Sequence, residues 1–203
     1  MNSSASTAFR RAARQLAWAL AVFAPGVLPG SAFAQPAQRL VKKPQPALSV
    51  ARLEKALHDL VNRERRAQGL EPLARDATLA VVARNHSDDM AKRNYFSHQS
   101  PEGEGFGARY ARARYKCALR VGDTLHLGAE NLAQGNLYAS VTTVNGVQTF
   151  DWNSEAQIAG AAVAGWMDSP GHRVNLLARQ WRHEGIGVAI APDRKVYVTQ
   201  NFC

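Results

Sequence analysis

The sequence predicts an α+β domain in which helices pack against an antiparallel sheet. Apolar residues recur at helical spacing early in the chain, over residues 48–68 and 76–94. Two stretches close the chain with alternating side-chain character, residues 185–191 and 195–202. Strands and helices do not alternate regularly between these parts, so a doubly wound parallel sheet is not indicated. The length of 203 residues suits a single domain.

Residues 1–34 have the three parts of an export signal. Three arginines lie among residues 10–14, an apolar run follows over residues 16–28, and Ala32-Phe33-Ala34 offers a small-x-small cleavage site. The run is shorter than the roughly 20 apolar residues that span a bilayer. We therefore predict a signal peptide cleaved before Gln35 and a secreted or periplasmic chain. An uncleaved anchor and a twin-arginine export route are the alternatives.

Composition limits the partners of the remaining chain. Residues 35–47 contain three prolines and predict a flexible linker, so the folded domain is expected over residues 48–203. Loss of the leader removes three arginines and no acid, which lowers the net charge from +9 to +6. The basic residues, Arg109 among them, are scattered and form no nucleic-acid motif. We expect no nucleic-acid partner, no transmembrane segment in the mature chain, a monomer, and weak attraction to anionic envelope surfaces.

Two long helices are predicted first. Apolar residues from Val50 to Val61 share one helix face, and Gly69 provides a stop. Asp76 is a suitable N-cap for a second helix that ends near Asn94. His86 lies on the apolar edge of this second helix and is predicted to be a buried core histidine rather than a ligand.

Local signals define the middle of the chain. A short third helix is expected over residues 106–115, and β-branched residues around Asn145-Gly146 predict a hairpin. Ser154 with Gln157 three residues later forms a capping box, which opens a helix to about Met167. The Ser169-Pro170-Gly171 segment is expected to end that helix.

The two cysteines, Cys117 and Cys203, both lie in the predicted exported part. Exported cysteine pairs usually form disulfides, so we predict a Cys117–Cys203 bridge. A nucleophilic Cys117 next to Lys116, or metal ligation by the pair, are the alternatives.

Several short segments in a fixed order carry a resemblance to a known family. They cover nearly all of residues 48–203: Leu60–Arg66, Phe96-Ser97-His98, Gly128-Ala129-Glu130-Asn131-Leu132, Trp166–Leu177 with its Ser169-Pro170-Gly171-His172-Arg173 core, Gly185–Val188 and Val198–Phe202. These segments resemble the signatures of the CAP superfamily, also called SCP or PR-1-like, in its bacterial secreted branch.

The resemblance implies an α-β-α sandwich and a cleft that holds two histidines and two acids. His98, Glu130 and His172 match three of these four residues, and Asn131 and Ser169 would also line the cleft. Ser169 stands where many eukaryotic members carry the second acid. Asp168 is its neighbour, but its side chain would point about 100° away around a helix.

Two imidazoles are good ligands for a divalent metal such as zinc, so His98 and His172 are predicted to bind one weakly with support from Glu130. A hydrogen-bonded network that stabilises the loops is the alternative. The family includes members of several functions, but the sequence lacks a complete catalytic set, which favours a non-enzymatic extracellular binding domain for a small apolar molecule, lipid, peptide or metal. A hydrolase acting on a peptide or envelope polymer through His98, Glu130 and His172 is the second hypothesis.

Overall fold

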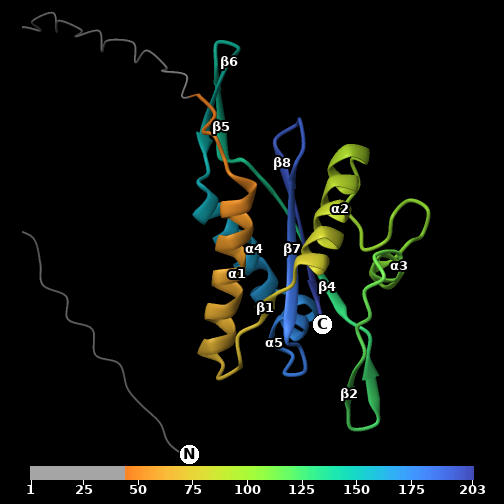
Figure 1. The fold of residues 1–203 in the computed structure, drawn as a ribbon. Helices are drawn as coiled ribbons and strands as arrows, with labels where there is room; N and C mark the ends of the chain where they lie inside the picture. The colour runs from red at the N-terminus through yellow and green to blue at the C-terminus, as the bar shows by residue number, and fades with distance from the viewer. Residues whose placement is uncertain (1–43) are drawn as a thin grey trace, which may run out of the picture. The chain divides into compact units, whose positions relative to one another are not determined.

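The computed structural model describes residues 44–203 (Figure 1). The predicted signal peptide, residues 1–34, and most of the predicted linker lie outside the described residues. Residues 44–47, the last four of that linker, are exposed and have no regular secondary structure.

The described residues form five helices and eight strands. The helices are α1 (Val50–Ala67), α2 (Ala77–Arg93), α3 (Phe106–Arg112), α4 (Glu155–Asp168) and α5 (Pro170–Leu177). The strands are β1 (Ala74–Arg75), β2 (Leu119–Val121), β3 (Thr124–His126), β4 (Ala129–Asn136), β5 (Tyr138–Val144), β6 (Val147–Trp152), β7 (His183–Ile190) and β8 (Lys195–Phe202).

A four-stranded sheet with the order β1-β7-β8-β4 forms the middle layer. Strands β7 and β8 form the predicted antiparallel pair, β4 adds a further antiparallel strand that was not predicted, and the two-residue β1 adds a parallel edge. Helix α2 packs on one face against β7 and β8, while α1, α4 and α5 cover the other face (Figure 1). The layers therefore form the predicted α-β-α sandwich.

Two glycines on β7 bring α2 unusually close to the sheet. A Cβ atom on Gly185 would lie 2.1 Å from the backbone nitrogen of Ala80, and one on Gly187 would lie 2.0 Å from that of Arg84. Both distances are far inside van der Waals contact, so only glycine allows the α2 backbone to rest directly on β7. This contact fixes the position of α2 on the sheet, and with it the place where the loop that carries His98 begins.

The main core lies between the sheet and the α1, α4 and α5 layer. The predicted apolar face of α1 supplies Leu53, Leu57 and Val61, all fully buried, and α4 supplies Trp166. The indole Nε1 of Trp166 donates to the carbonyl oxygen of Leu132 at 2.9 Å. Trp166 is thus a core residue, as predicted, and its hydrogen bond joins α4 to β4.

The local sequence signals are confirmed where they concern near neighbours in the chain. The Asp76 side chain accepts from the backbone N–H of Leu79, and Ser154 and Gln157 form the predicted capping box. Asn145 and Gly146 have φ angles of 50° and 77° at the β5–β6 turn. The Cys117–Cys203 disulfide is also present, with the two Cα atoms 5.6 Å apart.

The segment that ends α4 also begins a helix that the sequence analysis did not predict. Ser169 terminates α4 as expected, but Pro170 then occupies the first turn of α5. Proline suits that position because its fixed φ matches the helix and its missing N–H would have no partner there.

Candidate functional site

The three residues of the predicted cluster lie close together although they come from separate elements. His98 lies in the loop after α2, Glu130 is the second residue of β4, and His172 is the third residue of α5. His98 Nδ1 lies 3.0 Å from Glu130 Oε1, and the His98 and His172 ring centres are 6.5 Å apart. Their roles as ligands or catalysts remain predictions.

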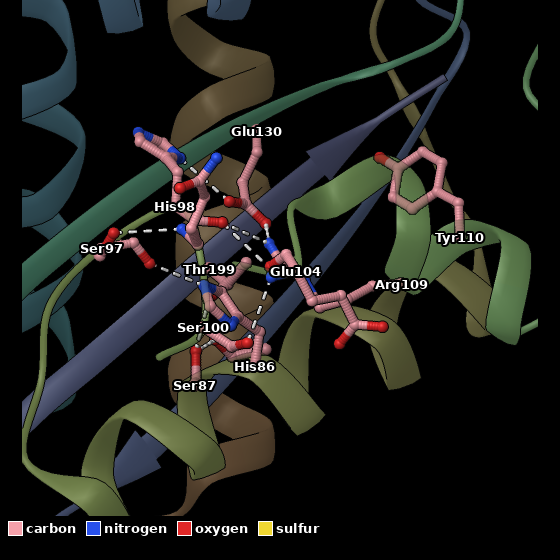
Figure 2. A network of polar contacts seen from close by, with 12 residues as sticks. His86, Ser87, Ser97, His98, Ser100, Glu104, Arg109, Tyr110, Glu130 and Thr199 are labelled. Carbon is pink, nitrogen blue, oxygen red and sulfur yellow. Dashed lines mark hydrogen bonds and ion pairs between the residues drawn. The ribbon is translucent and has the colours of Figure 1, made fainter. Parts of the chain in front are cut away.

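A buried arginine that the sequence analysis counted among scattered surface charges completes this cluster. Arg109 Nη2 donates to Glu130 Oε2 at 2.6 Å, and both side chains are almost fully buried. Arg109 also donates to the carbonyl oxygens of Glu104 and His98, at 2.8 and 3.2 Å. Figure 2 shows His98 and Arg109 approaching Glu130 from two sides. The arginine therefore anchors both the acid and the loop that carries His98.

The ion pair fixes the chemical state of the cluster. With Oε2 bound to a guanidinium, the Glu130 carboxylate acts as an acceptor only, so His98 Nδ1 is the donor toward Oε1. This assignment leaves His98 Nε2, on a half-exposed side chain, available to a ligand. Both carboxylate oxygens of Glu130 therefore already have a partner, His98 at Oε1 and Arg109 at Oε2.

Two asparagines hold α5 against β4 and so position His172. Asn131 Nδ2 donates to the backbone carbonyl of His172 at 3.1 Å. Asn175 Nδ2 donates to Asn131 Oδ1 at 3.0 Å and to the carbonyl of Glu130 at 3.3 Å. Asn131, predicted to be a cleft residue, is fully buried and acts here as a positioning residue.

The same hydrogen-bond chain continues across the sheet to a second histidine–glutamate pair. Asn131 donates to Gln200 Oε1 at 3.3 Å, and Gln200 donates in turn to Glu184. His58 Nδ1 lies 2.6 Å from the other Glu184 oxygen. Buried Glu184 thus receives donors from β8 and α1, which satisfies a carboxylate that would otherwise be costly to bury.

The second acid expected from the family pattern is absent from the cluster. Ser169 occupies its sequence position and lines a cleft beside His172. Asp168 is exposed and lines a different surface hollow with Pro170 and Arg173. It therefore does not replace the missing carboxylate.

The cleft beside His172 is mainly apolar and has a volume of about 320 Å³. It runs between β4 and α4, where small residues of the helix leave space. Its lining includes Phe96, Leu132, Ile158, Ala161, Ala162, Gly165, Trp166, Val196 and Val198, with Gln134, Ser169 and His172 as polar members. Such a cleft suits an apolar ligand with few polar groups.

A second, larger cavity of about 540 Å³ is lined by residues of α2 and α3, His86 and Arg109 among them, and by residues of the loop between the two helices. Its charged groups are satisfied by one another, since Arg93 pairs with Glu102 and Arg112 pairs with Glu104. This cavity offers no unpaired charge to a ligand, so the apolar cleft is the better candidate site.

Two histidines at the site have lowered pKa values. Burial lowers the pKa of His172, and the nearby His98 lowers it further. Burial also lowers the pKa of His86, whose Nε2 lies 3.0 Å from the carbonyl oxygen of Ser97. His86 is only 2 % exposed, which confirms its prediction as a core histidine.

The positions of His98 and His172 do not form a ready zinc site, and the metal prediction stays a prediction. Two imidazoles bound to one tetrahedral zinc ion have their ring centres roughly 5 Å apart, given zinc–nitrogen distances near 2 Å. The His98 and His172 centres at 6.5 Å would have to move closer to share an ion. Among residues 44–203, no group of three or more histidine, cysteine, aspartate or glutamate side chains is arranged to hold a metal.

An α-β-α sandwich with a His-Glu-His cluster at its sheet edge defines the class of protein. Residues 58–202 match the family model for CAP, the cysteine-rich secretory protein family. The chain therefore belongs to the CAP family.

Two relatives come from Bacillus subtilis strain 168. The uncharacterized protein YkwD is 33 % identical over 139 residues, which cover 68 % of this chain and 43 % of YkwD. The uncharacterized membrane protein YlbC is 36 % identical over 149 residues, covering 73 % of this chain and 34 % of YlbC. The chain thus matches less than half the length of either relative.

Solved structures share the fold. An extracellular SCP-domain protein from Bacillus anthracis is 30 % identical with a TM-score of 0.53, over 75 % of this chain and 40 % of that one. An outer surface protein from Borrelia burgdorferi is 17 % identical with a TM-score of 0.56, over 76 % and 94 % of the two chains. At 17 % identity the second likeness concerns the fold alone. No helix within residues 44–203 has the length and apolar character needed to cross a membrane.

Proposed function

We propose that this protein is an exported CAP-domain binding protein whose apolar cleft between β4 and α4 takes a small apolar molecule with one polar end. The cleft of about 320 Å³ carries this proposal. Export after cleavage before Gln35 is part of it and is supported by the signal-peptide pattern. Mass spectrometry of the exported protein should find Gln35 as its first residue.

The chemistry of the cleft favours a lipid-like ligand. Apolar side chains line most of its wall, so burial of a ligand's hydrocarbon part would be favourable at about 25 cal/mol per Å². Ser169 and His172 supply polar groups for the other end of the ligand. His172 is neutral at neutral pH because burial lowers its pKa, so its ring can donate or accept a hydrogen bond.

Hydrolysis of a peptide or envelope polymer has less support from this arrangement. A general base must be free to take a proton from the nucleophile, and Glu130 is held by Arg109 and His98. His98 or His172 would have to act without a second acid, because Asp168 lies away from the cluster.

A cleft-filling variant tests the proposal. Ala161 and Ala164 are both exposed on α4, but only Ala161 lines the cleft. We expect saturable binding of a dansylated fatty acid by fluorescence, weakened at least about tenfold in Ala161→Trp because the indole fills the site. Ala164→Trp serves as the control. Equal binding by the parent chain and both variants would place the ligand elsewhere and reject the cleft.

A further inference from the structure

The β2–β3 hairpin carries an unusual share of the exposed apolar surface. Of the nine large apolar side chains exposed within residues 44–203, three lie on this short hairpin and its exit. Val121 is 52 % exposed, Leu125 49 % and Leu127 60 %. Apolar side chains gathered on a projecting element mark a surface that contacts another apolar phase.

The hairpin is held firmly at its base and free at its tip. Cys117, two residues before β2, is bound to Cys203, and Leu119 packs against the apolar core. On the returning strand the His126 ring makes an edge contact with Trp181, with centres 5.8 Å apart. Figure 1 shows the two strands extending away from the four-stranded sheet. The hairpin is thus tied to the domain at its base, while its tip extends away from it.

Three exposed basic residues lie on the hairpin or in the segment that leads into it. Arg114, Lys116 and Arg120 are all exposed, and none forms an ion pair within residues 44–203. Asp123 is the only acid between residues 113 and 127. Arg120 is the cross-strand partner of Leu125, so one cation lies directly beside an exposed aliphatic group. The hairpin therefore combines positive charge with apolar surface.

The β5–β6 hairpin shows that this combination is specific to β2–β3. It also exposes three aliphatic side chains, Val141, Val144 and Val147. Residues 138–152, however, include no lysine or arginine. The nearby cation there is Arg194 from outside the hairpin, which lies over the Phe150 ring at 4.6 Å from its centre. The two hairpins therefore differ in the cations that their own residues carry.

We propose that the β2–β3 hairpin docks the protein onto an anionic phospholipid membrane surface. The cations would lie among the lipid phosphates, while Val121, Leu125 and Leu127 enter the boundary between headgroups and acyl chains. A soluble polyanion would satisfy the cations but would give the aliphatic side chains no apolar phase. This docking is independent of what the β4–α4 cleft binds.

Vesicle sedimentation tests the docking. The protein is used as recovered after export, with its N-terminus identified by mass spectrometry. Vesicles contain equal parts of phosphatidylglycerol and phosphatidylcholine, or phosphatidylcholine alone. We expect binding to the anionic vesicles that weakens with added salt, and little binding to the neutral ones.

Three double variants locate the surface. Lys116→Gln with Arg120→Gln should weaken binding by about fivefold for each cation removed. Val121→Ser with Leu125→Ser should weaken it on the order of tenfold. Val144→Ser with Val147→Ser, on the hairpin whose own residues include no lysine or arginine, should leave binding unchanged. Circular dichroism checks that each variant is folded.

Three results would overturn the docking. One is equal loss of binding in the β2–β3 and β5–β6 serine variants. Another is binding that survives both β2–β3 variants. The third is retention on a soluble polyanion without sedimentation by anionic vesicles, which would assign the cations to a polymer partner.

Discussion

Replacing Arg109 by methionine tests whether the buried ion pair holds the site together. The substitution keeps much of the volume of the side chain but removes the guanidinium that donates to Glu130 Oε2 at 2.6 Å. It also removes the donors to the carbonyl oxygens of Glu104 and His98. Glu130, whose side chain is only 1 % exposed, would keep His98 as its remaining side-chain partner within residues 44–203.

The expected cost follows from that burial. Removing one partner of a buried pair leaves an uncompensated charge and typically costs about 3–5 kcal/mol of the free energy of unfolding. Arg112 provides a matched control, because it lies one turn away on α3 and pairs with Glu104 at 2.8 Å through an exposed side chain. Arg112→Met should cost less than about 1 kcal/mol, as exposed ion pairs do.

Urea unfolding followed by tryptophan fluorescence measures both variants. Adding Glu130→Gln to Arg109→Met removes the unpaired charge and should restore at least about 1.5 kcal/mol, which a double-mutant cycle reports as coupling. If Arg109→Met were as mild as Arg112→Met, or if the second substitution restored nothing, the assigned role of the buried pair would be wrong.

Three further predictions concern other parts of the structure. Gly187→Ala should lower the free energy of unfolding by more than about 2 kcal/mol, because its Cβ would lie 2.0 Å from the Arg84 nitrogen. Gly160→Ala in α4, with no atom within 4 Å of the new Cβ, should instead raise it by up to about 1 kcal/mol, and opposite signs in urea unfolding are the check. Because burial lowers the pKa of His86, the unfolded chain takes up a proton below about pH 6.5 that the folded chain does not. The free energy of unfolding should therefore decrease as the pH is lowered from neutral, until the pH falls below the pKa of His86 in the folded chain. The variant His86→Gln should show a smaller decrease. An identical pH profile in the variant would contradict this role of His86. Calorimetric titration with zinc should show weak binding that fades in acid, because a protonated imidazole cannot bind the metal and burial lowers the pKa at which His172 takes up its proton. His98→Ala and His172→Ala should each abolish it, and binding that survives both would place the metal elsewhere.

Sequence reasoning succeeded where the decisive contacts are close in the chain. Asp76 and Ser154 accept from backbone N–H groups three residues away, and Asn145-Gly146 needs only its own turn geometry. Each of these interactions joins residues within a few positions of each other, so the local sequence is enough to predict it. The cluster of His98, Glu130 and His172 was found differently, from its resemblance to a family.

The main omissions have a common physical origin. Strand β4 was not predicted because buried Glu130 and Asn131 interrupt its apolar pattern, and both are satisfied by partners distant in sequence. Arg109 lies 21 residues from Glu130 and has no sequence feature that distinguishes it from exposed arginines. Arg109 could have been predicted only by asking which cation neutralises Glu130 once that acid is expected to be buried. The spacing of Gly185 and Gly187 was visible, but its purpose required knowing where α2 lies.

The position of β8 within the sheet has a consequence for when the domain can fold. β8 is the last strand in the chain, yet it lies between β7 and β4 and supplies the antiparallel partner of each. Until residues 195–202 have been synthesised, β4 has no strand to pair with and the apolar core has no central layer. A nascent chain of this topology cannot complete its four-stranded sheet before β8 emerges. That order is compatible with the export that we propose, because the sheet and then the Cys117–Cys203 bridge would close after an extended chain has crossed the membrane.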